Sequence, residues 1–138
     1  MRNLILTLLL VLPFISFSQN WVTDDNFEEV INPRGGFSDD DEEVIVIEFW
    51  AKFNSVNAFP DWKKLDDLPG VSYFRVDLAS APKLKKDLKI RMAPTLLLYL
   101  RGDAFIKFKA KAGLDLLCPV DYDKLVRAIE VVKEESKF

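Results

Sequence analysis

The side chains that could carry chemistry in this 138-residue chain are few. Two asparagines, Asn54 and Asn57, stand three positions apart directly after an apolar run, and the chain holds a single cysteine, Cys118. It contains no histidine, which excludes histidine acid/base catalysis, Ser-His and Cys-His dyads and most zinc sites. One cysteine forms neither an intramolecular disulfide nor a C-x-x-C pair. The sequence therefore predicts no metal site and no bound cofactor.

Asn54 and Asn57 follow the apolar residues 44–50, where the pattern predicts that a strand ends and a helix begins. An asparagine at a helix start accepts hydrogen bonds from backbone N–H groups two or three residues later, so we expect Asn54 to cap this helix. Asn57 is expected to bond to nearby backbone or solvent. In the alternative, both amides point outward and recognise the main chain of a partner. Neither side chain supplies a thiolate or a labile proton.

Glu48 is the one charged residue within the apolar run 44–50. Strand alternation places it on the same face as Val44, Val46 and Trp50, and burial there would raise the pKa of its carboxyl group. We expect this acid to be partnered by water or by a lysine. A role as a new catalytic acid stays open at this point.

Cys118 lies in a segment before the last predicted helix, beside Leu116, Leu117 and Pro119. These apolar neighbours favour a buried thiol that packs as a small hydrophobe, and no adjacent basic residue would lower its pKa. The alternative is a monothiol redox protein that acts through Cys118, in mixed disulfides or as a disulfide-linked dimer. The sequence predicts no particular oligomeric state.

The hydrophobic patterns predict the elements that must position these residues. Continuous apolar stretches indicate strands that are buried on both faces, and amphipathic stretches indicate helices. Strands are expected at 44–50, 71–76, 95–100 and 104–111, and helices at 25–30, around 59–65, at 81–88 and at 121–133. Asp25 and Glu28 form a capping-box pattern for the first helix. A strand–helix–strand crossover should be parallel, and a turn at Gly102 should make the last two strands a hairpin, with Ala104 facing the core.

Two segments carry a resemblance to a known family. Phe49-Trp50-Ala51-Lys52-Phe53-Asn54-Ser55-Val56-Asn57 resembles the thioredoxin segment in which a buried strand ends in Phe-Trp-Ala and opens into Cys-Gly-Pro-Cys. Arg91-Met92-Ala93-Pro94-Thr95 resembles the start of the family's Pro-Thr strand, whose proline is cis. The resemblance implies an α/β, thioredoxin-like fold, with a central mixed sheet flanked by helices on both faces. Because both cysteine positions hold asparagines, it also implies that dithiol redox activity is absent.

The resemblance further implies a binding face. In the family, the backbone of the residue before the cis proline pairs with an extended substrate peptide, and Ala93 holds that position. We therefore expect the N–H and C=O of Ala93 to be unpaired and to bind an extended peptide or protein partner. Glu48 matches the family's buried acid. The expected binding residues are Trp50, Phe53, Asn54, Ser55, Val56, Asn57, Ala93 and Pro94.

The first eighteen residues predict export. Arg2, the apolar stretch 4–17 and the small residues Ser16 and Ser18 are typical of a secretory signal peptide. The stretch is shorter than the roughly 20 apolar residues that span a bilayer. Cleavage after residue 18 would release a domain of residues 19–138 that begins at Gln19, without a membrane anchor, into the periplasm or the medium. Its partner would then be in the cell envelope.

The charge balance of the expected mature domain excludes another class of partner. Removing Arg2 with the signal leaves 18 basic and 22 acidic residues, and so a net charge of −4. In the sequence, the lysines are scattered between acidic residues. Nucleic acid is therefore not an expected partner, since proteins that bind it present clustered positive charge.

Overall fold

The computed structural model describes residues 21–32, 43–110 and 116–135. The predicted signal segment 1–18 and the expected first mature residue, Gln19, lie outside these ranges. The strands are β1 (Trp21–Val22), β2 (Val44–Trp50), β3 (Val71–Asp77), β4 (Thr95–Leu100) and β5 (Asp103–Lys109). The helices are α2 (Phe27–Ile31), α3 (Trp62–Asp66), α4 (Pro82–Asp87) and α5 (Tyr122–Glu135), with 3-10 turns η2 (Lys52–Asn57) and η3 (Leu78–Ser80).

The five described strands form one mixed sheet in the order β1-β3-β2-β4-β5. β3 is parallel to β1 and to β2, as expected for the crossover, whereas β4 is antiparallel to both β2 and β5. The central strand β2 is buried from Val44 to Phe49. Its continuous apolar sequence forms this strand because both of its faces are covered.

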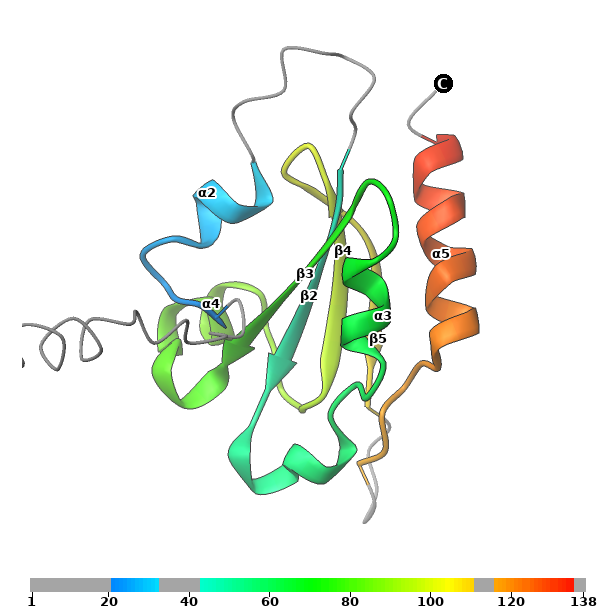
Figure 1. Ribbon diagram of the computed structural model, residues 1–138. Coiled ribbons are helices and arrows are strands. Elements are labelled where there is room, and N and C mark those ends of the chain that lie inside the picture. The colour runs from blue at the N-terminus through cyan, green and yellow to red at the C-terminus, as the bar shows by residue number, and fades with distance from the viewer. Residues whose placement is uncertain (1–20, 33–42, 111–115, 136–138) are drawn as a thin grey trace, which may run out of the picture.

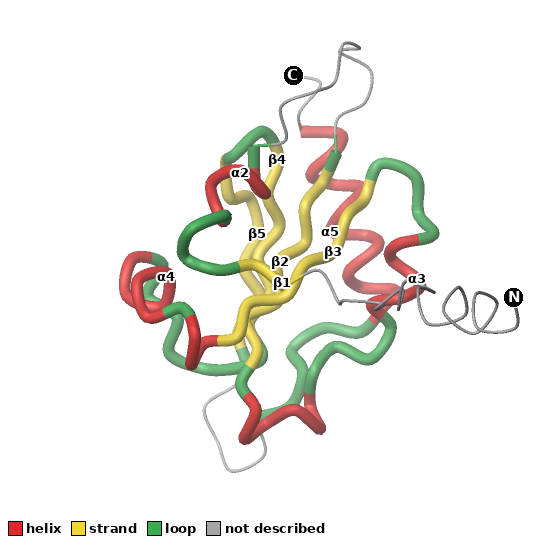
Figure 2. Tube along the Cα trace, turned by 60° about the vertical axis from the view of Figure 1, so that its left-hand side comes forward, coloured by secondary structure: helices red, strands yellow, loops and turns green. Residues whose placement is uncertain are grey.

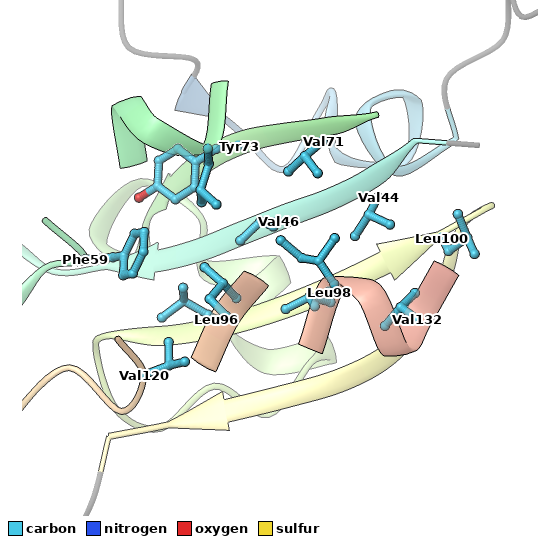
Figure 3. Close-up of a cluster of buried hydrophobic side chains, with 13 residues drawn as sticks. Val44, Val46, Phe59, Val71, Tyr73, Leu96, Leu98, Leu100, Val120 and Val132 are labelled. Carbon is cyan, nitrogen blue, oxygen red and sulfur yellow. The ribbon is translucent and has the colours of Figure 1, made fainter. Parts of the chain in front are cut away.

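Helices cover the two faces of the sheet, α3 and α5 on one side and α2 and α4 on the other (Figures 1 and 2). One core packs Val46, Leu96 and Leu98 against side chains of α3 and α5 (Figure 3). The second core packs Ile47 and Leu97 of the opposite face against α2 and α4. This arrangement confirms the predicted α/β architecture.

The helix expected around 59–65 is divided into η2 and α3. Pro60 lies in the gap between them. Proline has no N–H to donate and disfavours helical backbone at the preceding residue, here Phe59, so one continuous helix cannot form. The side chain of Phe59 instead enters the core.

The predicted capping box is wrong, because α2 begins at Phe27 after Asn26 and no side chain caps it. The side chain of Asn26 instead accepts a hydrogen bond from the backbone of Thr23. A carboxylate two positions earlier caps a different helix: Asp24 accepts from the backbone N–H groups of Lys83 and Leu84 at the start of α4.

The expected alternation along β5 holds only in part. Ile106 and Phe108 are half-buried and Ala110 is buried, but Ala104 is exposed. The register between β4 and β5 shifts between Leu98 and Tyr99, so that Leu98 faces Ile106 while Tyr99 faces Ala104. A bulge of this kind turns the end of the strand, which explains why the prediction for Ala104 is wrong.

We expect Gly102→Ala to destabilise the hairpin between β4 and β5. Arg101 and Gly102 both have positive φ, 53° and 84°, as a two-residue hairpin turn requires. A Cβ atom on Gly102 would clash with Oδ1 of Asn32. The expected loss in the free energy of unfolding is about 1 to 2 kcal/mol, measured by urea titration.

A second substitution separates the two causes of that loss. Because Asn32 meets the new Cβ with the end of its side chain, Asn32→Ala combined with Gly102→Ala should relieve the contact and leave the cost of the positive φ. Asn32→Ala alone is the control. Unchanged stability of Gly102→Ala would contradict the geometry of this turn.

Candidate functional site

Asn54 turns its side chain into the protein at the end of β2. It interrupts η2 with non-helical backbone angles, φ −122° and ψ 27°, and is only 9% exposed. Its Nδ2 donates to the carbonyl oxygens of Ala93 and Leu116, both at 2.9 Å. Its Oδ1 accepts from Nδ2 of Asn57 at 2.7 Å. We call these contacts the Asn54 network.

The predicted capping role of Asn54 is therefore wrong. Ala51 precedes η2, and no side chain caps this helix. The amide oxygen that would have accepted from backbone N–H groups is bonded to the side chain of Asn57. The alternative in which both amides point outward also fails for Asn54, since its nitrogen is directed to two carbonyl groups inside the protein.

The Asn54 network joins three segments that are distant in sequence. It connects η2 to the loop before β4 and to the segment that leads to α5. The Ala93–Pro94 peptide bond is cis, and both residues are buried. The expectation that the carbonyl group of Ala93 is unpaired is wrong, because the amide of Asn54 occupies it.

Large apolar side chains remain exposed around this network. Phe53 is 80% exposed, Val56 is 90% exposed and Leu117 is 63% exposed. Each of them is adjacent in sequence to a residue of the network, and the hydrogen bonds of that residue hold the backbone in place. We call these three residues the apolar face. Nearby, Trp50 is half-buried and packs edge-on against Trp21, with ring centroids 5.3 Å apart.

Glu48 lies fully buried at the end of β2. Its Oε1 accepts from the backbone N–H of Phe59 at 2.8 Å, and its Oε2 lies 3.2 Å from Nε of Arg75. The Nε hydrogen of Arg75 is directed to the hydroxyl group of Tyr73, 3.2 Å away, so the contact with Oε2 is an ion pair without hydrogen-bond geometry. The expected partner, a lysine or water, is corrected to Arg75.

A sequence signal for this pair did exist. Arg75 is the only basic residue of β3, and parallel pairing sets it opposite Glu48. Opposite charges on neighbouring buried strands attract each other strongly, because the interior screens them weakly. Arg75, Tyr73 and Leu116 are the residues of this region that sequence reasoning missed.

Burial dominates the electrostatics of this pair. It raises the pKa of the Glu48 carboxyl group, against the opposing effects of the Arg75 charge and the Phe59 N–H. Burial and the nearby carboxylate also raise the pKa of Tyr73. The guanidinium group of Arg75 lies over the rings of Tyr73 and Trp21, at 5.8 and 6.0 Å from their centroids. Glu48 is thus held in a buried ion pair.

Cys118 is half-buried beside the first core. Its thiol donates to the carbonyl oxygen of Val120 at 3.3 Å. Burial raises its pKa and the Glu48 carboxylate raises it further, whereas the hydrogen bond to Val120 acts in the opposite direction. A raised pKa leaves little of the nucleophilic thiolate at neutral pH.

We expect the Cys118 thiol to react slowly in the folded protein. A neutral disulfide reagent near pH 7 should label it at least about tenfold more slowly in the native state than in urea, since the thiol is shielded and protonated. Ser55→Cys in a Cys118→Ser background is the matched control, because Ser55 is exposed on η2. Equal native rates for the two thiols would favour the monothiol alternative.

No group of three or more His, Cys, Asp or Glu side chains suited to hold a metal ion occurs among the described residues. No helix within residues 21–32, 43–110 and 116–135 is long and apolar enough to cross a membrane. The arrangement offers hydrogen bonds and apolar contacts.

Comparison with known proteins identifies the family of this chain. The thioredoxin family model matches residues 18–118. The structure resembles a thioredoxin of Malassezia sympodialis, with 23% identity over 82% of this chain and 89% of that one and a TM-score of 0.59. It also resembles Chlamydomonas reinhardtii thioredoxin f2, with 19% identity over 81% and 94% and a TM-score of 0.61. The short form of spinach chloroplast thioredoxin f is also similar, with 19% identity over 83% of this chain and 92% of that one and a TM-score of 0.62. No curated protein matches.

Proposed function

The chain belongs to the thioredoxin family, and we propose that it is an exported binding module of that family without dithiol redox activity. The sequence holds one cysteine, and both positions of the family's motif hold asparagines. The observation that carries the proposal is the Asn54 network, which joins the loops of this site with uncharged hydrogen bonds and leaves Phe53 and Val56 exposed beside it.

In this proposal the partner is an extended peptide or a protein surface that contacts side chains of the apolar face. Phe53, Val56 and Leu117 offer apolar area on a held backbone, and fixed groups bind at a smaller entropic cost. Trp50, Ser55 and Asn57 would flank the contact. Because Ala93 and Pro94 are buried and the Ala93 carbonyl group is bonded, they would support this surface from below.

The proposed compartment is the cell envelope or the medium, reached through cleavage of residues 1–18. The small residues Ser16 and Ser18 at the predicted cleavage site support it. The proposed mature domain, residues 19–138, would begin at Gln19. Mass spectrometry of the protein isolated from its native host tests this step, and an intact Met1 terminus would contradict it.

We expect the purified protein to show no catalytic reduction of protein disulfides. A mixed disulfide needs a second thiol to resolve it, and none is present. In a disulfide-reduction assay with dithiothreitol, turnover should equal that of Cys118→Ser. Asn54→Cys combined with Asn57→Cys should gain activity, since it restores both thiols. Turnover well above the Cys118→Ser control would overturn the redox part of the proposal.

A separate experiment tests the binding role. Peptides selected from a displayed library against the purified protein should bind at least about tenfold more weakly to Phe53→Ser with Val56→Ser, because both substitutions remove exposed apolar contacts. Lys52→Ser with Ser55→Ala is the matched control on the same turn, where both residues are exposed. Equal loss in both double variants, or in neither, would place the binding surface elsewhere.

A further inference from the structure

Six exposed basic side chains come from neighbouring parts of the chain, namely α4, the segment after it and β5. Two hydrogen bonds fix this arrangement: Lys107 Nζ donates to the carbonyl oxygen of Leu88, and the N–H of Ala110 donates to that of Pro94. Residues 89–94 therefore run beside residues 107–110. The basic cluster consists of Lys85, Lys86, Lys89, Arg91, Lys107 and Lys109.

None of these six side chains forms an ion pair with any residue that the structure describes. The nearby carboxylate of Asp24 is engaged by backbone N–H groups at the start of α4, and Asp87 is the one acidic residue of α4. The pKa of Lys107 is lowered, first by burial and then by the charge of Lys109. Four of the six lie within residues 85–91 of the sequence, and the fold brings Lys107 and Lys109 beside that segment.

The cluster adjoins an open edge of the sheet. Of the described strands, only β4 pairs with β5, so the outer backbone groups of β5 face no strand in residues 21–32, 43–110 and 116–135. Lys107 and Lys109 pair with Leu97 and Thr95 and are two positions apart, so they project from the same face of the sheet. A strand added at this edge would set every second side chain near them.

Lysines on an edge strand have another common use, which is to prevent edge-to-edge aggregation. That use accounts for Lys107 and Lys109, which lie on β5 itself. It does not account for Lys89 and Arg91, which lie on the neighbouring segment and add positive charge beside this edge. Unpaired like charges repel each other, and an anionic partner would relieve that repulsion.

We propose that the β5 edge binds an extended acidic segment of another polypeptide, which adds to the sheet as a further strand and sets carboxylates at alternate positions against the basic cluster. Main-chain hydrogen bonds to β5 would supply affinity, and the alternating carboxylates would supply specificity. The proposal uses none of the residues of the apolar face and is independent of the function proposed above.

The test measures binding of a labelled peptide of about ten residues, with glutamate and threonine alternating, by fluorescence anisotropy at low ionic strength. The native protein should bind it, and Lys107→Glu with Lys109→Glu should weaken the binding by at least about tenfold. Lys52→Glu with Arg127→Glu, two exposed residues of η2 and α5 that belong neither to β5 nor to the basic cluster, makes the same charge change and should bind nearly as the native protein does. If the first pair does not fold, Lys107→Gln with Lys109→Gln replaces it.

Two further probes separate strand addition from attraction to any polyanion. A peptide with proline in place of each threonine keeps the charge but cannot pair along a sheet edge, so it should bind at least about tenfold more weakly. Vesicles rich in phosphatidylglycerol should bind more weakly than the alternating peptide. Equal binding of the two peptides, preference for vesicles, or equal effects of both charge-reversal pairs would each overturn the proposal. So would absence of binding.

Discussion

Replacing Arg75 with methionine should lower the free energy of unfolding by about 3 to 5 kcal/mol near pH 8. The substitution removes the only cation that faces Glu48 among the described residues, at 3.2 Å, and leaves a fully buried carboxylate whose charge is met only by the N–H of Phe59. Methionine keeps much of the side-chain volume, so the loss would come from charge and hydrogen bonding more than from a cavity. Urea titration measures it.

The loss should depend on pH in a defined direction. Burial raises the folded-state pKa of Glu48 above the ordinary value of a glutamate carboxyl group. A carboxyl group with a raised pKa contributes its full stability below its unfolded-state pKa, and that contribution is lost as the pH rises through the folded-state pKa. Removing Arg75 removes an effect that lowers this pKa, so Arg75→Met should be closer to the native protein near pH 5 than near pH 8.

The double variant Glu48→Gln with Arg75→Met is the control, because it buries no charge at this position. It should be more stable than Arg75→Met near pH 8 and should lose the associated pH dependence. Equal destabilisation of Arg75→Met at both pH values would show that the guanidinium group acts through packing against Trp21 and Tyr73.

The sheet could be predicted from the sequence because its signal is local. The apolar stretches that form β2 and β4 are long enough to require burial on both faces, and the structure places both in the centre of the sheet. The division between η2 and α3 also had a local signal, Pro60. The amphipathic spacing continues across that proline and therefore predicts one helix, whereas the chain forms two separate elements.

The polar contacts of the site could not be predicted in the same way, because they join distant segments. Asn54 and Leu116 are 62 positions apart and meet only when the loops at this end of the sheet are in place. Local propensity favours an asparagine cap at the start of η2. In the folded protein the amide of Asn54 instead bonds to the carbonyl groups of Ala93 and Leu116. Without it, both carbonyl groups would lack this donor, which would cost more than the lost cap.

Replacing Asn54 with aspartate should destabilise the protein most severely among single changes in the Asn54 network. A carboxylate has no hydrogen to donate, yet it would face the carbonyl oxygens of Ala93 and Leu116, where Nδ2 now lies at 2.9 Å from each. Asn57 could still donate to the other oxygen, but a buried charge that faces two acceptors costs several kcal/mol, and we expect a loss of about 4 kcal/mol near pH 8. Protonation of the new carboxyl group at acidic pH restores one donor, so the loss should shrink there.

Graded variants show whether this loss comes from hydrogen bonding. Asn54→Ala leaves both carbonyl groups without their donor and should cost about 2 to 3 kcal/mol, whereas Asn57→Ala removes the donor to Oδ1 of Asn54 and should cost about 1 kcal/mol. Ser55→Ala, on the exposed side of the same turn, should cost almost nothing. If Asn54→Ala and Ser55→Ala were equally stable, the amide would not hold these loops. The hydrogen bonds of Asn54 also position the backbone that carries Phe53 and Leu117. Asn54→Ala should therefore weaken binding at the apolar face without removing any side chain from it.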